Sequence, residues 1–228
     1  SRRTASPSPR SVVSLHSSNG VCLVGALDYR KYAQQFVPIV ERARSGRSMD
    51  PVEELRALIM GVADNDQRTE SLAQLERIEV AVQGGRWHRS AIGVLLEATC
   101  VEDRETVPDF LATFTSCSCY LYDWNEDFAE AIYAFFSELN DKTVPWASPT
   151  DTWRAIVPPD QLAATSEAFG ALSARDLKKM LAEAEGGDVF SEDDAKEIAG
   201  WWEAVRKALR VSLRTERAFY FSIHKPEV

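Results

Sequence analysis

The sequence predicts a helix-rich α+β domain of about seven to eight amphipathic helices with a small sheet, and an all-α fold is the alternative. Three observations favour this class. Helix-start signals precede several segments whose apolar residues recur at three- and four-residue intervals. Shorter apolar or alternating segments have the pattern of strands. The chain has 228 residues, of which 45% are hydrophobic, so it can bury a sizeable core.

Residues 49–61 carry the clearest helix start. We expect Asp50 to cap this helix, Pro51 to lie in its first turn, where a missing N–H is harmless, and Glu53 to complete a capping box. The apolar residues of the segment share one face: Val52, Leu55, Ile59 and Val62. A helix with one buried face is therefore predicted here.

Two further helices have clear start signals in the last third of the sequence. Ser173 and Asp176 are spaced as a capping box, and Gly186 with Gly187 supplies a stop. Ser191 is expected to cap the second helix. The predicted buried stripe of that helix consists of Ile198, Trp202, Val205 and Leu209.

Weaker patterns predict the remaining elements. Helices are expected at 28–44 with an interruption at Pro38, and at 69–83, 107–115, 125–140 and 160–171. Strands are expected at 11–16, 21–25, 91–98, 117–123 and 217–224. The alternation of side chains that a half-buried strand requires is clearest in the last two of these strands.

The chain is predicted to consist of a short tail and one folded unit. Residues 1–19 are rich in Ser, Pro and Arg, so we expect a flexible basic tail, followed by a single domain at 20–228. Residues 140–160 contain four prolines and no clear periodicity. This segment is the best candidate for a long connection, and it is where a boundary between two lobes would fall.

The formal charge of the chain is −9. Residues 1–50 hold eight Lys or Arg against three Asp or Glu, which leaves 18 against 32 in residues 51–228. An acidic body repels phosphate backbones, so this composition argues against nucleic-acid binding. No run approaches the roughly 18 apolar residues of a membrane span, and only four cysteines suit a reducing compartment. We therefore expect a cytoplasmic protein that binds neither nucleic acid nor membrane.

Residues 115–128 concentrate cysteines, aromatic residues and acids. Pleat alternation in a strand over 117–123 would turn its cysteines inward and Tyr120 and Tyr122 outward. The candidate binding surface, called here the acidic–aromatic surface, consists of Tyr120, Tyr122, Asp123, Trp124, Glu126, Asp127 and Glu130. Aromatic residues surrounded by charge are typical of an interaction hot spot. In the alternative interpretation, the tyrosines cover a neighbouring helix and the acids begin a solvated one.

The cysteines support an alternative with a metal or thiol site. The side chains that could supply tetrahedral zinc ligands are Cys117, Cys119, Cys100 and His88. Their spacing departs from the paired gaps of zinc sites, and buried thiols usually act as small apolar core residues. A catalytic dyad of Cys100 or Cys119 with His88 is the thiol form of this alternative.

No local sequence motif identifies a catalytic reaction. The sequence contains no glycine-rich nucleotide-binding pattern, no serine elbow and no zinc-protease motif, and we expect no cofactor. The leading hypothesis is a non-catalytic protein-binding module, such as an inhibitor, immunity factor or regulator, whose protein partner has a basic surface. Homo-oligomerisation stays open. The alternatives are a metal- or thiol-dependent enzyme centred on Cys117 and Cys119, and a helical small-molecule pocket lined by Trp153, Trp201 and Trp202.

Overall fold

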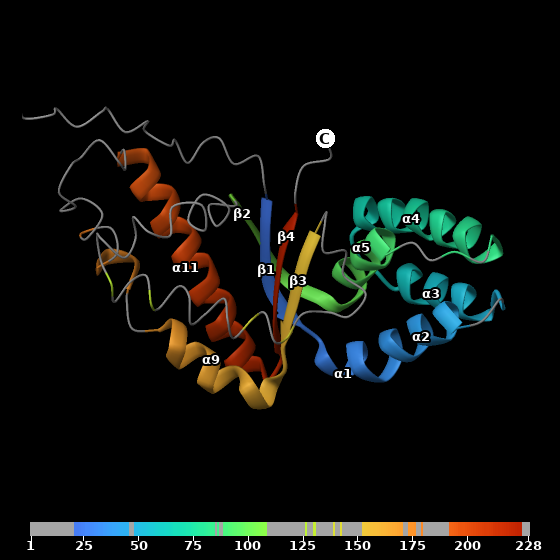
Figure 1. Ribbon diagram of the computed structural model, residues 1–228, viewed down its shortest axis with the longest axis horizontal. Helices are drawn as coiled ribbons and strands as arrows, with labels where there is room; N and C mark the ends of the chain where they lie inside the picture. The colour runs from blue at the N-terminus through green and yellow to red at the C-terminus, as the bar shows by residue number, and fades with distance from the viewer. Residues whose placement is uncertain are drawn as a thin grey trace, which may run out of the picture.

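The computed structural model describes residues 21–45, 48–84, 86, 89–108, 126, 130, 139, 142, 152–170, 173–176, 179 and 192–224. Within these residues, four strands form one antiparallel sheet in the order β2-β1-β4-β3 (Figure 1). The strands are β1 (Val21–Leu27), β2 (Val101–Pro108), β3 (Thr152–Val157) and β4 (Ala218–His224). The sheet confirms the predicted α+β class and excludes the all-α alternative.

Helices cover both faces of this sheet (Figure 1). One side holds α1 (Tyr29–Lys31), the π-helical turn η2 (Tyr32–Phe36), α2 (Val37–Ser45), α3 (Asp50–Met60), α4 (Asn65–Gln83) and α5 (Arg89–Cys100). The other side holds the 3₁₀ turn η3 (Pro159–Gln161), α9 (Leu162–Phe169) and α11 (Glu192–Thr215). The sheet is therefore the middle layer between two groups of helices.

The two faces of β4 belong to two different cores. Ala218 and Tyr220 join the apolar cluster formed with α2 to α5. Because strand side chains alternate, Phe219 and Phe221 point to the opposite face, where α11 packs against β1, β2 and β4. Both phenylalanines are fully buried. A central strand enclosed on both faces explains the nearly continuous apolar run in its sequence.

Gly25 allows β1 and β2 to approach closely at a β-bulge. The pairing register shifts between Val24 and Ala26, and Asp103 on β2 has a φ of 49°. A Cβ atom at Gly25 would lie 2.8 Å from Val101 Cγ1 and 2.9 Å from the Glu102 carbonyl oxygen. Any side chain at this position would push the bulged strand away.

Three expectations about secondary structure are wrong. Residues 91–98, predicted as a strand, lie in α5, because a helix buried on nearly all sides has the same continuous apolar pattern as a buried strand. The segment 140–160, predicted as a long connection, contains β3. The predicted helix at 107–115 also begins inside β2.

One of the predicted helix caps is confirmed, one is wrong, and the third, Ser191, lies outside the described residues. Ser173 and Asp176 form the predicted capping box. The Ser173 N–H donates to the Asp176 carboxylate at 3.3 Å, and the Asp176 N–H donates to the Ser173 hydroxyl at 3.1 Å. Asp50, predicted to cap α3, lies inside its first turn, and its N–H donates to Ser48 Oγ at 3.2 Å. Glu53 makes no capping contact in the described residues, where its carboxylate lies near Arg56.

The predicted buried faces of α3 and α11 are confirmed residue by residue. The interruption expected near Pro38 is also present, because the backbone over Tyr32–Phe36 is π-helical just before this proline. Strands expected at 11–16 and 117–123, and the tail at 1–19, lie outside the described residues. None of the helices in the described part of the chain combines the length and apolar character that crossing a bilayer requires.

Candidate functional site

A cluster of buried polar side chains lies between α5 and the sheet. Arg154 on β3 pairs in register with Ser222 on β4, and Tyr220 lies two residues away on the same face. Glu97 projects from α5 toward all three. Its Oε1 accepts hydrogen bonds from Tyr220 Oη at 2.7 Å, Ser222 Oγ at 3.1 Å and Arg154 Nε at 3.3 Å. The cluster therefore joins α5 to the edge strand β3 and to the neighbouring inner strand β4.

This polar cluster is enclosed. Glu97 is 7% exposed, Arg154 is 1% exposed, and the two hydroxyl-bearing residues are fully buried. A Cβ atom at Gly93, one helical turn before Glu97, would lie 2.1 Å from Arg154 Cζ, so the guanidinium fills the space that a side chain would need. Arg154 Nη1 is buried and has no hydrogen-bond partner in the described part of the chain.

The electrostatics of the cluster favour a fixed charge state. Burial raises the pKa of Tyr220 well above its ordinary value, and the nearby Glu97 carboxylate raises it further. The tyrosine therefore stays neutral and donates a hydrogen bond to Glu97. A neutral phenol, a carboxylate and a guanidinium that are bonded to one another in a closed space act as a structural link rather than as a reaction centre.

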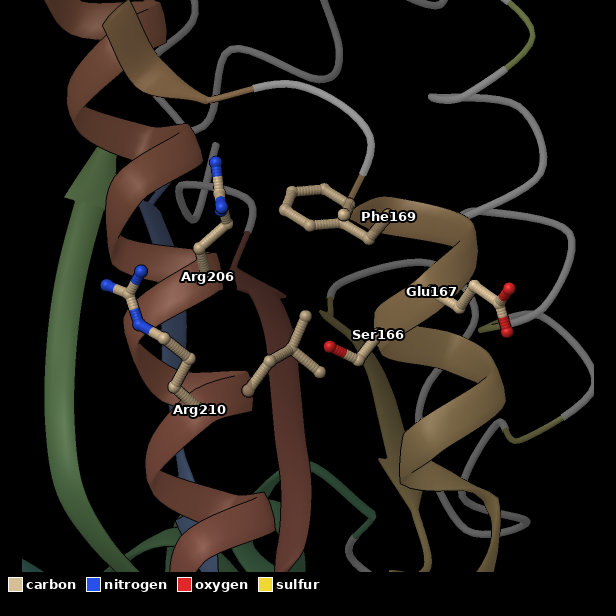
Figure 2. A pocket seen from close by; sticks show the side chains of 7 residues that line it. Ser166, Glu167, Phe169, Arg206 and Arg210 are labelled. Carbon is tan, nitrogen blue, oxygen red and sulfur yellow. The ribbon is translucent and has the colours of Figure 1, made fainter.

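A second site is a pocket between α9 and α11, about 520 Å³ in volume (Figure 2). We call it the α9–α11 pocket, and its lining consists of Ser166, Glu167, Phe169, Gly170, Arg206, Leu209 and Arg210. Phe169 and Leu209 are buried and form its inner wall, while Arg210 is exposed. The pocket thus combines an apolar wall with two guanidinium groups from one helix.

Trp201 and Trp202, predicted to line a small-molecule pocket, do not line the α9–α11 pocket. Both are buried, at 1% and 0% exposure, and neither belongs to the pocket lining. Trp202 lies behind the pocket wall, stacked on Phe169 with ring centroids 4.2 Å apart. Trp153 lies in β3, and its side chain is outside the described part of the structure.

The acidic–aromatic surface is described at two of its positions. Glu126 and Glu130 both lie in helical backbone and both are exposed. Among the described residues, neither carboxylate forms an ion pair. Tyr120, Tyr122, Asp123, Trp124 and Asp127 lie outside the described residues, so their part in this surface stays a prediction.

The metal and thiol alternative is described at Cys100 only. This side chain is 1% exposed, and its Sγ lies 3.5 Å from Thr99 Oγ1. Burial raises the pKa of the Cys100 thiol to about 11, which keeps it neutral and a poor nucleophile near neutral pH. Cys117, Cys119 and His88 lie outside the described residues. In the part of the chain that is described, no three or more His, Cys, Asp or Glu residues gather as metal ligands would.

Two sets of residues escaped the reasoning from sequence. Glu97 and Arg154 stand alone in apolar segments, and an isolated charge in such a segment was the available signal for a buried pair. Arg206 and Arg210 lie four residues apart on a predicted helix, a spacing that places two cations on one face. The chain matches no protein-family model, no curated protein and no solved structure.

Proposed function

We propose that this chain is a non-catalytic module that binds a protein partner with a basic surface, in the manner of an inhibitor, immunity factor or regulator. The observation that carries the proposal is the exposure of Glu126 and Glu130. Two carboxylates one helical turn apart, without a cationic partner among the described residues, are available to a basic residue of another protein.

Other acidic side chains of the chain are engaged internally. Glu54 pairs with Arg42 at 2.6 Å and thereby joins α3 to α2. Glu105 pairs with Lys207 at 3.0 Å and joins β2 to α11. Among the described residues, Glu126 and Glu130 tie no elements together, so their charge can serve an intermolecular contact.

The sequence supplies the anchors that such a contact needs. Tyr120, Tyr122 and Trp124 precede the exposed carboxylates within ten residues. At protein interfaces, tyrosine and tryptophan provide most of the binding free energy, while surrounding charges steer the partner and accelerate association. The acidic composition of residues 51–228 adds long-range attraction for a basic partner.

The ionisable groups of the interior also favour binding over catalysis. The Cys100 thiol is held neutral by burial, and the Glu97 carboxylate is occupied by three donors. Neither group is poised to attack a substrate or to exchange a proton with one. The low cysteine content leads us to expect that the module acts in the cytoplasm.

The proposal is tested by capturing the partner and then measuring its affinity for variants. The wild-type chain is used as bait in a native extract, and the captured protein is identified by mass spectrometry and purified. Tyr122→Ala with Trp124→Ala should weaken its binding by at least about 2 kcal/mol, or roughly 30-fold, with an unchanged Tm.

A matched control separates the proposed surface from general effects of mutation. Tyr29→Ala with Tyr32→Ala removes two aromatic side chains about ninety residues earlier in the sequence, from α1 and the π-helical turn η2. This control should lower Tm without lowering the affinity of the folded protein. The proposal fails if the captured partner binds the Tyr122 and Trp124 variant as tightly as wild type, or if that variant unfolds.

A further inference from the structure

The α9–α11 pocket has the size and openness of a small-molecule site. Its volume of about 520 Å³ lies within the range of roughly 300–1,000 Å³ that ligand pockets occupy. Gly170 at the end of α9 leaves one edge without a side chain, and a Cβ atom there would lie 2.6 Å from the Ser166 carbonyl oxygen. The close packing of the backbone at this edge is therefore compatible with glycine only.

The inner wall of this pocket is apolar and rigid. Phe169 stacks on Trp202 and contacts Trp201 edge-on, with ring centroids 6.0 Å apart in the second pair. Leu209, one turn beyond Val205 and two turns beyond Trp202 on the same helix stripe, completes the wall. Such a wall suits the ring or chain of an apolar ligand and offers few polar partners besides the Ser166 hydroxyl.

The α11 side of the pocket, which also supplies Leu209, carries positive charge. Arg206 and Arg210 extend from successive turns of α11, and Arg206 reaches the level of Phe169 (Figure 2). Glu167, the acidic residue of the lining, turns its carboxylate away from α11 (Figure 2). Arg210 pairs with Glu203 at 2.5 Å, but both side chains are about half exposed, and such surface pairs exchange partners at little cost.

We propose that the α9–α11 pocket binds a small molecule that has an apolar ring or short chain and one anionic head group, a phosphate or a carboxylate. The apolar part lies against Phe169 and Leu209, and the head group accepts hydrogen bonds from Arg206 and Arg210. Guanidinium groups are suited to this role because their donors match the oxygen spacing of both anions. This function is independent of the proposed partner-binding surface.

If Arg206 only stabilised the fold, its substitution would have a different effect from the loss of ligand binding proposed above. An arginine near the C-terminus of α9 would stabilise the last carbonyl groups of that helix, and its loss would lower Tm whether or not a ligand binds. In the ligand-binding role, loss of the two guanidinium groups leaves the fold intact and removes affinity. Binding and melting must therefore be measured on the same variants.

The experiment uses calorimetric titration of the full chain with four probes: phenyl phosphate, benzoate, inorganic phosphate and benzyl alcohol. The first two carry both an apolar ring and an anion, and they distinguish a phosphate from a carboxylate site. At least one of them should bind at least about tenfold more tightly than inorganic phosphate and than benzyl alcohol. Trp202 should report the same event as a change in tryptophan fluorescence, because it contacts Phe169.

Charge-matched variants decide whether the pocket is responsible. Arg206→Gln with Arg210→Gln should weaken the better amphipathic anion at least about tenfold with an unchanged Tm. Arg44→Gln with Arg214→Gln removes the same charge from exposed positions outside the pocket and should leave affinity unchanged. The proposal is overturned if neither amphipathic anion binds, if both double variants lose affinity equally, or if the pocket variant loses Tm and keeps its affinity.

Discussion

The two faces of the sheet use the same residue types for different purposes. On the α5 face, Arg154 and Glu97 are enclosed and bonded to each other across two layers. On the α11 face, the described buried layer is mainly apolar and contains no charged side chain, and Arg206 and Arg210 line the α9–α11 pocket at its edge. The same residue type therefore has two roles. A charged side chain that is enclosed and bonded stabilises the fold, whereas one at the edge of a pocket can bind a ligand.

The energetic reason is desolvation. A buried ion pair contributes little net stability, because its attraction roughly offsets the loss of hydration, but removal of one partner leaves the other charge buried and unpaired. When an exposed arginine loses its partner, the free energy of unfolding changes little, because water replaces the lost contact. Removal of a charged side chain should therefore cost much free energy of unfolding on the α5 face and little at the α9–α11 pocket.

The largest effect is expected for Glu97→Ala. The free energy of unfolding should fall by about 5 kcal/mol, because Arg154 loses its counter-ion and two buried hydroxyl groups lose their acceptor. Urea denaturation measures this loss. The double variant Glu97→Leu with Arg154→Met should return to within about 2 kcal/mol of wild type. A single variant that loses less than about 1 kcal/mol would show that the cluster is not a closed structural unit.

On the α11 face, Trp202→Ala should lower the free energy of unfolding by about 3–5 kcal/mol, because it opens a cavity behind Phe169. Thermal and urea denaturation check the loss. No double variant with a charged partner should rescue it, since the indole packs in an apolar layer. A melt unchanged within error would mean that the stripe of α11 does not bury this residue.

Tyr220→Phe should have an intermediate effect of about 2 kcal/mol, because it removes one hydrogen bond to the buried Glu97 carboxylate and keeps the ring in place. The measurement is urea denaturation in the wild-type and Glu97→Leu, Arg154→Met backgrounds. The effect should largely disappear in the second background. An equal loss in both would assign the stability to packing of the ring.

Cys100 predicts a loss of stability at alkaline pH. The fold raises the pKa of this thiol from its ordinary value of 9.0 to about 11, so folding favours the neutral form. The resulting stability is complete below pH 9 and is lost as pH rises toward 11. Wild type should therefore lose more free energy of unfolding between these pH values than Cys100→Ala does. Parallel curves for the two proteins would contradict an enclosed, neutral thiol.

The smallest effect is expected at the pocket. Arg206→Gln with Arg210→Gln should change the free energy of unfolding by no more than about 0.5 kcal/mol, because Arg210 is exposed and Arg206 is only half-buried. Thermal denaturation at two salt concentrations measures it. A loss comparable with that of Glu97→Ala would erase the distinction between the two faces.

The parts of the fold that the sequence could predict follow from local chemistry. The Ser173 and Asp176 capping box and the apolar stripe of α11 depend on residues close together in the chain. The edge strands β2 and β3 could not be predicted in this way. The β2 strand carries the charged run 102–105, and β3 follows prolines, so its pairing with β4 is decided by contacts distant in sequence.

The candidate sites show the same limit. Exposure of Glu126 and Glu130 agrees with the helix start that the sequence predicts. The enclosure of Glu97 depends on residues more than fifty positions away on β3 and β4, and the α9–α11 pocket depends on how two helices pack. The isolated charges and the four-residue spacing of Arg206 and Arg210 are visible in the sequence, but neither signal identifies the element that packs against them.

The most direct test of the account compares charge reversal at exposed carboxylates. The central claim is that the carboxylates of the acidic–aromatic surface serve a partner, whereas those of the interior serve the fold. Glu126→Lys with Glu130→Lys should slow association with the captured partner at least about tenfold at low salt, with an unchanged Tm. Glu70→Lys with Glu76→Lys, exposed on α4, makes the same change in net charge and should slow it far less. Equal association rates for wild type and the Glu126 and Glu130 variant would contradict the claim.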